Sequence, residues 1–249
     1  MLAAQRKDHL LDLLARDGRV VAKTAADEVG VSEDAIRRDL RELAEEGKLQ
    51  RVYGGALPIP AREAPVSERT ELATASKERV ARAAVATIRP DSTIILDAGT
   101  TTLAMARILP SGTGLTVITA SPAVALAAAE HSDARVIVVG GELSRHSLVT
   151  GGGMAMEAIQ HVAADTFFLG ATGIDPARGL TTGELEDAVT KRALASRCTE
   201  TVVLASEEKI GAVARYPILA LDAVTAIITD PADDNPLTAE VRSRIDGQE

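Results

Sequence analysis

Three arginines, Arg37, Arg38 and Arg41, stand close together in a segment with helical spacing. On a helix that advances about 100° per residue, Ile36 and Leu40 fall on one apolar stripe, whereas the arginines fall on its flank and on the opposite face. A guanidinium can bind the edge of a guanine through two hydrogen bonds, or bind a phosphate. The spacing therefore predicts a helix that packs on one side and presents cations to the major groove of DNA on the other.

The residues on either side of this helix support the same interpretation. Ser32 precedes it and is a good N-cap, and Gly47 is expected to end it. The stretch KLQRVYGGAL that follows is short and basic and ends in a glycine pair, which predicts a β-hairpin wing. We expect the cations of this wing to reach phosphates. The predicted DNA-binding residues are Ser32, Arg37, Arg38, Arg41, Lys48 and Arg51.

A solvent-exposed charged face is the alternative interpretation of these arginines. Residues 1–57 contain ten lysines and arginines against eleven acidic residues, which is an unusual balance for a DNA-binding module. Charge alone makes a solvated face as probable as DNA contact. The order of helix, turn, arginine helix and basic hairpin favours DNA.

A second group of polar residues lies in the segment DAGTTT at 97–102, after an apolar run and before a helical pattern. Gly99 lets the backbone approach a ligand, and Thr100 and Thr101 offer hydroxyls at the start of a helix, which predicts a phosphate-binding loop. Asp97 would repel a phosphate, so we assign it to a sugar hydroxyl or a loop amide. The alternative is a strand-to-helix turn that binds no ligand.

Other polar loops also follow apolar runs. In an open α/β sheet, the loops after the strand ends meet at one edge, where ligands bind. Arg145 and Lys209 are candidate cations for a phosphate, although each taken singly fits an ordinary surface charge. The expected effector-binding residues are Asp97, Gly99, Thr100, Thr101, Gly140, Gly141, Arg145 and Lys209.

The overall composition limits the remaining possibilities. The net charge of −9 predicts no general attraction to polyanions, so contact with DNA must come from a local cluster. Cys198 is the only cysteine, which excludes an internal disulfide, and the histidines show no metal-ligand spacing. We therefore expect no metal and no cofactor. The charged N-terminus and the shortness of the apolar runs predict a soluble, cytoplasmic protein.

The elements that must position these groups fall into two regions. Residues 1–57 show short helical patterns, residues 58–75 hold three prolines and read as a linker, and residues 76–249 alternate apolar runs with helical segments. The alternation predicts a mostly parallel α/β sheet. The predicted strands are STIIL, LTVIT, ARVIVV, TFFL, TVVLA and VTAIIT, and the predicted helices span residues 77–88, 101–109, 122–131, 153–161, 188–198 and 236–245.

The first region closely resembles the winged helix-turn-helix of the DeoR family. The residues that carry this resemblance are Ser32, the run Ile36-Arg37-Arg38-Asp39-Leu40, Leu43, Gly47, and Arg51 followed by Gly54-Gly55-Ala56. The second region is similar to the sensor domain of the same family. Its matching stretches are the Asp-x-Gly-Thr-Thr loop at 97–101, Val-Val-Gly-Gly at 138–141, Phe-Phe-Leu-Gly-Ala at 167–171, Gly-Leu-Thr-Thr at 179–182, and Lys209 with Gly211.

The resemblance implies an α+β chain of two domains, with an N-terminal winged helix-turn-helix and a C-terminal α/β domain of the ribose-phosphate isomerase and CoA-transferase type. It implies a repressor of sugar-metabolism genes that a phosphorylated sugar releases from its double-stranded DNA operator. Because one helix-turn-helix reads few bases, we also expect a homo-oligomer, a dimer or tetramer.

Two other functions fit the residues. A sugar-phosphate isomerase-like enzyme could use the carboxylates Asp175, Glu184, Glu186 and Asp187 as an acid/base pair, but it has no use for the arginine helix. An architectural DNA-binding protein has no use for the glycine-rich loops. We therefore expect a regulator and not an enzyme.

Overall fold

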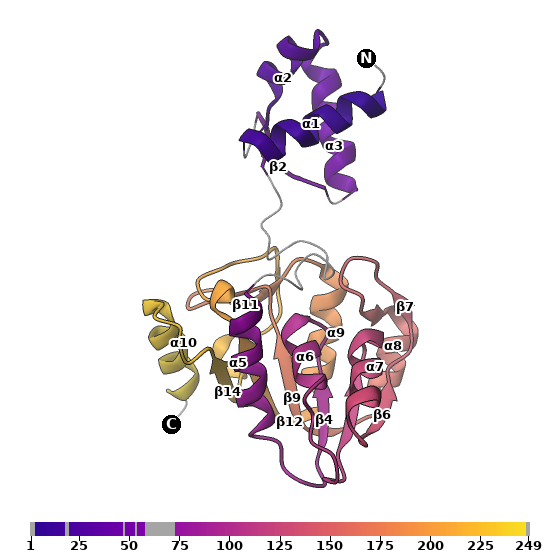
Figure 1. The fold of residues 1–249 in the computed structure, drawn as a ribbon, viewed down its shortest axis with the longest axis vertical. Helices are drawn as coiled ribbons and strands as arrows, with labels where there is room; N and C mark the ends of the chain where they lie inside the picture. Colours follow the sequence, from indigo (N-terminus) through magenta and orange to yellow (C-terminus); the bar gives the residue numbers. More distant parts are fainter. Residues whose placement is uncertain (1–2, 18–19, 47, 53, 58–72, 248–249) are drawn as a thin grey trace. The chain divides into compact units, whose positions relative to one another are not determined.

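The computed structural model describes residues 3–17, 20–46, 48–52, 54–57 and 73–247. The chain forms two compact units, Met1–Ala61 and Arg62–Glu249, which we call the N-terminal unit and the C-terminal unit (Figure 1). Most of the predicted linker over residues 58–75 lies outside the described residues, as does Gly47. The first helix of the C-terminal unit begins at Thr74, within the segment assigned to the linker.

The described residues of the N-terminal unit form three helices and a small antiparallel sheet in the strand order β1-β3-β2. Leu10 and Leu14 from the first helix pack with Ile36, Leu40 and Leu43 from the third in one buried cluster. The apolar stripe predicted for the arginine helix is therefore its buried face. The elements are α1 (Ala3–Asp17), β1 (Val20–Val21), α2 (Ala22–Val29), α3 (Glu33–Glu45), β2 (Gln50–Val52) and β3 (Gly55–Leu57).

The turn before α3 and the hairpin after it follow from local chemistry. Gly30 ends α2 with a φ of 71°, a left-handed conformation that suits glycine, and the Ser32 hydroxyl accepts a hydrogen bond from the Ala35 N–H at 3.3 Å. β2 and β3 pair antiparallel, and Gly55 lies so close to β1 that a Cβ would meet the Val20 carbonyl oxygen at 1.8 Å. The predicted winged helix-turn-helix is confirmed.

The C-terminal unit is built on a six-stranded sheet in the order β14-β12-β9-β4-β5-β6, in which every neighbouring pair is parallel. All six apolar runs of the sequence form these strands, so the predicted parallel α/β sheet is confirmed. The strands are β4 (Thr93–Leu96), β5 (Thr116–Thr119), β6 (Arg135–Val138), β9 (Ala164–Gly170), β12 (Cys198–Ala205) and β14 (Ala226–Thr229).

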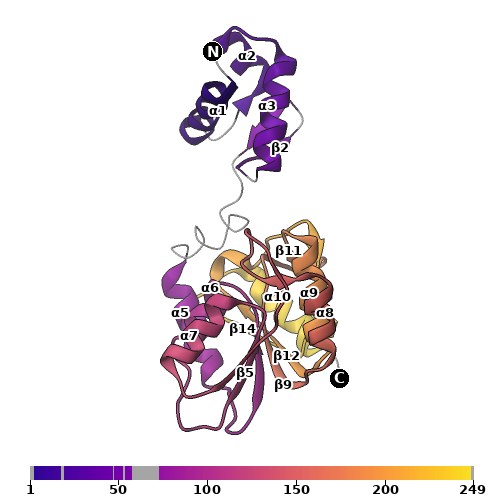
Figure 2. The ribbon, with the colours of Figure 1, turned by 90° about the vertical axis from the view of Figure 1, so that its right-hand side faces the viewer.

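Helices cover both faces of this sheet because successive strand residues point to opposite sides. Phe168 packs with α5, α6 and α7 on one face, whereas its neighbour Phe167 packs with α8, α9 and α10 on the other (Figure 2). Apolar residues at consecutive positions therefore fill two separate cores. The helices are α5 (Thr74–Val85), α6 (Thr100–Ala106), α7 (Pro122–His131), α8 (Gly152–Gln160), α9 (Leu185–Ala195) and α10 (Pro236–Asp246).

Several short elements outside the six-stranded sheet were not predicted. They are the hairpin of β7 (Glu142–Leu143) and β8 (Thr150–Gly151), the three-stranded sheet of β10 (Gly173–Asp175), β11 (Gly179–Thr182) and β13 (Tyr216–Pro217), and the 3-10 turns η2 (Glu207–Lys209) and η3 (Leu221–Ala223). Of these elements, η2 carries Lys209 and β11 carries Thr182, both discussed below. Among the described residues, no helix is both long enough and apolar enough to span a bilayer.

Candidate functional site

The arginine face of α3 is exposed, as the helical spacing predicts. Arg37, Arg38 and Arg41 all have exposed side chains. Arg37 is held on its own helix by Glu33 at 2.7 Å and lies 3.9 Å from Asp34. Within the described part of the chain, Arg38 and Arg41 have no ion-pair partner. These two guanidiniums therefore remain available to an external anion.

The orientation of α3 is fixed by a charged pair that sequence reasoning did not single out. Asp39 is 3% exposed and accepts hydrogen bonds from Nε and Nη2 of Arg6 on α1. This bond raises the pKa of the Arg6 guanidinium. Lys7, one residue further along α1, pairs with Glu42 at 2.7 Å and with Glu46 at 3.2 Å. The available signal was the position of Asp39 beside Ile36, Leu40 and Leu43 on the buried side of α3, because a buried acid needs a partner.

The cations of the wing differ in their surroundings. The Lys48 ammonium lies 2.8 Å from a Glu46 carboxylate oxygen, so part of its charge is compensated. Arg51 is exposed on β2, opposite Ala56 on β3. Ser32 acts as the N-cap of α3 and uses its hydroxyl oxygen as the acceptor, so its O–H can still donate to a DNA phosphate.

In the C-terminal unit, four of the predicted effector residues line one pocket. They are Gly99, Thr100, Thr101 and Lys209. Gly99 has a φ of 153°, which favours glycine, and it caps the seven-residue helix α6. The Thr101 side chain is nearly fully buried, and its hydroxyl has no hydrogen-bond partner among the described residues. This hydroxyl can therefore hydrogen-bond a ligand without giving up a bond within the protein.

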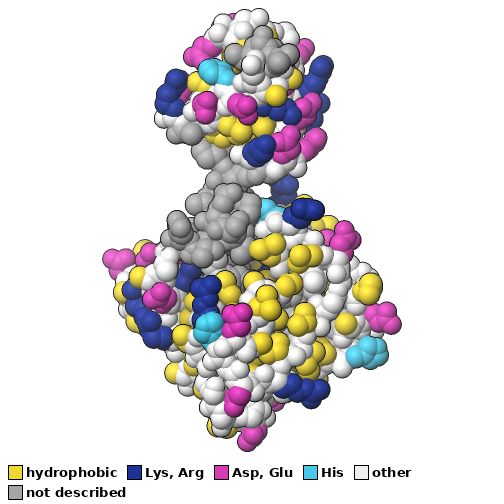
Figure 3. Space-filling view, turned by 45° about the vertical axis from the view of Figure 1, so that its right-hand side comes forward, with side chains coloured by type: hydrophobic (Ala, Val, Ile, Leu, Met, Phe, Trp, Pro, Cys, Tyr) yellow, Lys and Arg dark blue, Asp and Glu magenta, His cyan; other side chains and the backbone are white. Residues whose placement is uncertain are grey.

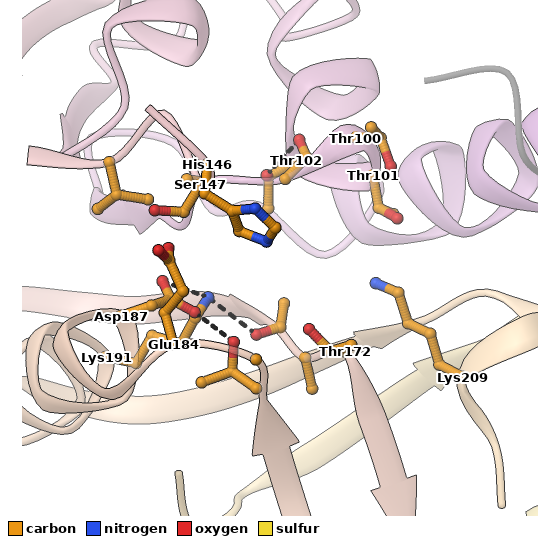
Figure 4. A pocket seen from close by; sticks show the side chains of 17 residues that line it. Thr100, Thr101, Thr102, His146, Ser147, Thr172, Glu184, Asp187, Lys191 and Lys209 are labelled. Carbon is orange, nitrogen blue, oxygen red and sulfur yellow. Dashed lines mark hydrogen bonds and ion pairs between the residues drawn. The ribbon is translucent and has the colours of Figure 1, made fainter. Parts of the chain in front are cut away.

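The opposite wall of the pocket holds Lys209. This side chain is buried, and its ammonium donates a hydrogen bond to the Leu204 carbonyl at 3.4 Å. Figure 4 shows it extending toward Thr100 and Thr101 across the pocket. The remaining lining residues are Ala98, Thr102, His146, Ser147, Val149, Gly170, Ala171, Thr172, Thr182, Gly183, Glu184, Asp187 and Lys191.

A buried charge network lies beneath the pocket, and its lysine was not predicted. Lys191 on α9 donates to Asp97 and to the Gly170 carbonyl, and lies 3.5 Å from Asp187. Asp187 accepts a hydrogen bond from the Thr182 hydroxyl at 2.6 Å. Burial raises the pKa of the Asp97 carboxyl, and the Lys191 ammonium opposes this shift. The only sequence signal was the spacing of four between Asp187 and Lys191, which is usual for a solvated helical pair.

The structure brings together only part of the predicted effector set. Asp97 belongs to the buried network and accepts the N–H of Gly170, the last residue of β9, at 2.8 Å. Gly140, Gly141 and Arg145 are not among the residues that line the pocket. A Cβ on Gly141 would meet the Gly151 carbonyl oxygen at 2.4 Å, so its role in the structure is to pack the β7–β8 hairpin closely. Any contact of these three residues with an effector stays a prediction.

The four carboxylates considered for an isomerase are not assembled into one catalytic pair. Glu184 lines the pocket and accepts hydrogen bonds from the Ser144 hydroxyl, while Asp187 is engaged by Lys191 and Thr182. Asp175 accepts the N–H groups of Ala177 and Arg178 in a turn. Glu186 is exposed. In the part of the chain that the structure covers, no cluster of three His, Cys, Asp or Glu side chains could hold a metal ion.

Comparison with known proteins assigns both units. A model of the DeoR-like helix-turn-helix domain matches residues 6–60, and a model of the DeoR C-terminal sensor domain matches residues 72–231. The HTH-type transcriptional regulator GlpR of Haloferax volcanii is 31% identical over 98% of this chain and 96% of that protein. The glycerol-3-phosphate regulon repressor of Escherichia coli K12 is also 31% identical, over 92% of each chain.

Solved structures match this chain at low identity. Ribose 5-phosphate isomerase A from Neisseria gonorrhoeae is 17% identical over 56% of this chain and 53% of that one, with a TM-score of 0.41. The translation initiation factor eIF-2B from Pyrococcus horikoshii OT3 is 14% identical over 92% of this chain and 82% of that one, also with a TM-score of 0.41. The fold of the C-terminal unit is defined by the strand order of its own six-stranded sheet.

A winged helix-turn-helix with an exposed arginine face, followed by an α/β unit with a polar pocket, defines a DNA-binding transcriptional regulator with its own sensor domain. Both family models and the full-length relatives agree with this class. The chain belongs to the DeoR family of transcriptional regulators.

Proposed function

We propose that this regulator represses sugar-metabolism genes and leaves its operator when a phosphorylated sugar binds the pocket of the C-terminal unit. The observation that carries the proposal is the convergence of Lys209, Thr100 and the unsatisfied hydroxyl of Thr101 on one pocket. An ammonium and two hydroxyls suit the oxygens of a phosphate. Helix α6 has only seven residues, so we assign phosphate binding to these side chains and not to the N-terminus of the helix.

The rest of the pocket suits the hydroxyl-rich part of such a ligand. Glu184, His146 and Ser147 line it and present acceptors and donors that suit sugar hydroxyls (Figure 4). The name of one relative, the glycerol-3-phosphate regulon repressor, supports a phosphorylated ligand. The putative aga operon transcriptional repressor of Escherichia coli O157:H7, which is 32% identical over 92% of this chain and 88% of that protein, supports repression.

A set of contacts also connects the Lys209 loop to α5, the first described element after residue 72. The Glu207 N–H donates to the Ser76 hydroxyl at 3.1 Å. Three residues further along α5, Arg79 donates two hydrogen bonds to Asp230, at 2.7 and 2.6 Å, and holds the pKa of that carboxyl well below its usual range. A ligand that moves Lys209 would therefore act on the helix that follows the linker. We propose this route for induction.

The isomerase-like enzyme receives less support. An isomerase needs a carboxylate that is free to take a proton from a sugar carbon. Asp187 is instead bound to Lys191 and Thr182, and Asp175 caps a turn. Glu184 lines the pocket without a second carboxylate, among the described residues, that is free to act with it, and it accepts hydrogen bonds from the Ser144 hydroxyl. We propose that the pocket binds its ligand without turnover, and incubation with pentose and hexose phosphates should give no product.

The experiment uses the full chain and an operator selected from a random duplex library. Phosphorylated sugars and the matching free sugars are added, and DNA release is followed by fluorescence anisotropy. We expect release by a phosphorylated sugar only. The double variant Thr100→Val, Lys209→Ala should bind the operator normally but resist release. It loses two charge-assisted contacts with the effector, worth about 1.5–3 kcal/mol each. This loss matches or exceeds the free energy that typically couples effector binding to DNA release, about 1–3 kcal/mol.

Arg107→Ala is the matched control, because it removes one exposed cation of the C-terminal unit that does not line the pocket. This variant should respond like the parent chain. If the double variant is released at the parental effector concentration, the effector binds elsewhere and the proposal is wrong.

A further inference from the structure

A second cavity adjoins the pocket of the C-terminal unit and is much larger. The pocket has a volume of about 40 Å³, whereas the second cavity has a volume of about 340 Å³. One ordered water needs about 10–15 Å³ of such space, so the pocket has room for little more than a phosphate group. Sites for small molecules usually measure about 300–1,000 Å³, a range that only the second cavity of these two reaches. Its lining includes Glu142, Leu143, Ser144, Ser147, Glu186 and Asp187.

The two cavities meet at the end of the pocket that lies away from Lys209. Ser147 and Asp187 line both of them. Figure 4 shows these two residues at one end of the pocket, and the proposed phosphate-binding residues Thr100, Thr101 and Lys209 at the other. A phosphate held by Lys209 and by the unsatisfied hydroxyl of Thr101 therefore leaves the rest of its molecule directed toward the second cavity.

A hydrogen bond crosses the boundary between the two cavities. Ser144, which lines the second cavity, donates its hydroxyl at 3.2 Å to Glu184, which lines the pocket. This bond joins the turn of the β7–β8 hairpin to the residue that precedes α9. A hydroxyl or ammonium of a ligand can take the place of the Ser144 hydroxyl as donor to Glu184. A ligand that passes from one cavity to the other therefore keeps this carboxylate hydrogen-bonded.

The lining of the second cavity is acidic. It contains Glu142, Glu186 and Asp187, and no lysine, arginine or histidine is among the described residues that line it. Lys191 lies 3.5 Å from Asp187, but the exposed Glu142 and Glu186 have no ion-pair partner in the described part of the chain. Figure 3 shows the acidic side chains on one face of the C-terminal unit scattered mostly one by one, so three around one cavity is a local concentration. Such a lining attracts hydrogen-bond donors and cations and repels a phosphate.

We propose that the effector spans both cavities, with its phosphate in the pocket and its other end in the second cavity. That end carries hydroxyls or an amino group and no second phosphate. The regulator therefore selects sugar monophosphates against sugar bisphosphates, because the acidic lining repels the additional phosphate. This inference rests on the proposed function, since it requires that one phosphate binds beside Lys209.

The test is isothermal titration calorimetry of the full chain without DNA. The titrants are glucose 6-phosphate, glucosamine 6-phosphate, fructose 6-phosphate and ribose 5-phosphate, their free sugars, fructose 1,6-bisphosphate and inorganic phosphate. We expect at least one monophosphate to bind at least about tenfold more tightly than the bisphosphate. Glu186→Lys replaces a repelling charge by an attracting one, so it should raise the affinity for the bisphosphate at least about tenfold. Inorganic phosphate, which fits the pocket alone, should respond much less.

Glu130→Lys is the matched control for the charge. It changes the net charge by the same amount, at an exposed residue of α7 that lines neither cavity. The ratio of the affinities for monophosphate and bisphosphate should stay at the parental value in this variant, so a general effect of charge on anion binding is separated from an effect of the second cavity.

Leu143→Trp tests the same placement by volume. Leu143 is 48% exposed on β7, so folding should tolerate the larger side chain. The indole takes up space in the second cavity and should weaken binding of the monophosphate at least about tenfold, while inorganic phosphate binds as it does to the parent. Leu126→Trp, at a position of α7 that is 64% exposed and lines neither cavity, is the control and should behave like the parent.

The outcomes separate this inference from the proposed function. If no phosphorylated sugar binds more tightly than its free sugar, the proposed function fails and this inference fails with it. If monophosphates bind more tightly than free sugars, but Glu186→Lys and Leu143→Trp behave like their controls, the ligand does not enter the second cavity and only this inference is overturned. A parent chain that binds the bisphosphate as tightly as the monophosphates overturns it as well.

Discussion

The arginine face of α3 and the pocket of the C-terminal unit place their charged side chains in opposite ways. Arg38 and Arg41 stand on one helix, are exposed and have no ion-pair partner among the described residues. Asp97 and Lys191 come from different elements, are almost fully buried and bind each other. A long, rigid partner such as DNA can be met by one helix face, whereas a small ligand must be surrounded by several segments.

The same contrast predicts how substitutions will act. An exposed arginine without internal contacts contributes to binding and little to stability. A buried ion pair contributes to the shape of the pocket, and loss of one partner leaves an uncompensated charge inside the protein. Changes at the exposed Arg38 and Arg41 should therefore alter function alone, and changes beneath the pocket should alter folding as well.

The largest effect is expected for Lys191→Met. This change leaves Asp97 buried without its cation, which typically costs about 3–5 kcal/mol of unfolding free energy. Denaturant unfolding of the full chain measures the loss for the C-terminal unit. Because burial already raises the pKa of Asp97, the deficit should shrink as the pH falls and the carboxyl becomes neutral.

Asp97→Asn combined with Lys191→Met is the control for this prediction, since it removes both charges. The double variant should recover much of the lost stability. Arg38→Ala should stay within about 0.5 kcal/mol of the parent chain. Equal losses of unfolding free energy in Lys191→Met and Arg38→Ala would contradict the expected difference between the buried network and the exposed arginine face.

A smaller effect is expected for Arg38→Ala in operator binding. If this guanidinium binds a guanine with two hydrogen bonds, its loss should cost about 1–3 kcal/mol and relax specificity at one base pair. Competition binding with single-base operator variants measures both quantities. Arg37→Ala should weaken binding less, because Glu33 already holds this side chain on α3. A loss that is uniform over all sequences would assign Arg38 to a phosphate instead.

A comparable or smaller effect is expected for Ser76→Ala, which removes the acceptor for the Glu207 N–H. One neutral hydrogen bond is worth about 0.5–1.5 kcal/mol, so the effector concentration for operator release should rise up to about tenfold. Effector binding to the DNA-free chain should change little. Ser92→Ala, which removes a hydroxyl bonded within its own turn, is the control and should behave like the parent. Equal behaviour of the two variants would reject the route through α5.

The smallest effect is expected for Arg51→Ala on the wing. Loss of one phosphate contact should weaken all DNA sequences alike and reduce the slope of log affinity against log salt by about one. Lys48→Ala should change the slope less, because Glu46 already pairs with Lys48. A sequence-dependent loss at Arg51 would indicate base contact.

The arginine face could be predicted because a single helix period determines it. Once Ile36, Leu40 and Leu43 form the buried stripe, the positions of the arginines follow. The wing followed from a glycine pair and a short basic run. The pair between Arg6 and Asp39 could not be predicted in the same way, because it joins two helices that are distant in sequence.

Sequence reasoning could place pocket residues only where they directly follow a strand of the parallel sheet. Gly99, Thr100, Thr101 and Lys209 follow strands of the parallel sheet, so they were expected at one edge. Lys191, His146 and Ser147 reach the pocket from a helix and from the short β7–β8 hairpin. Strands of two to four residues leave little pattern in a sequence, and partners such as β11 and β13 are distant along the chain. Helix α9 also begins at Leu185, three residues before its predicted start.

The most direct test of the regulatory account is isothermal titration calorimetry of the full chain. The titrants are a phosphorylated sugar found by thermal-shift screening and its free sugar, each against the parent and Lys209→Ala. We expect the parent to bind the phosphorylated form at least about tenfold more tightly than the free sugar, because the Lys209 contact alone is worth about 1.5–3 kcal/mol. Lys209→Ala should lose most of that preference. Equal affinity of the parent for both sugars, or an undiminished preference in Lys209→Ala, would contradict the account.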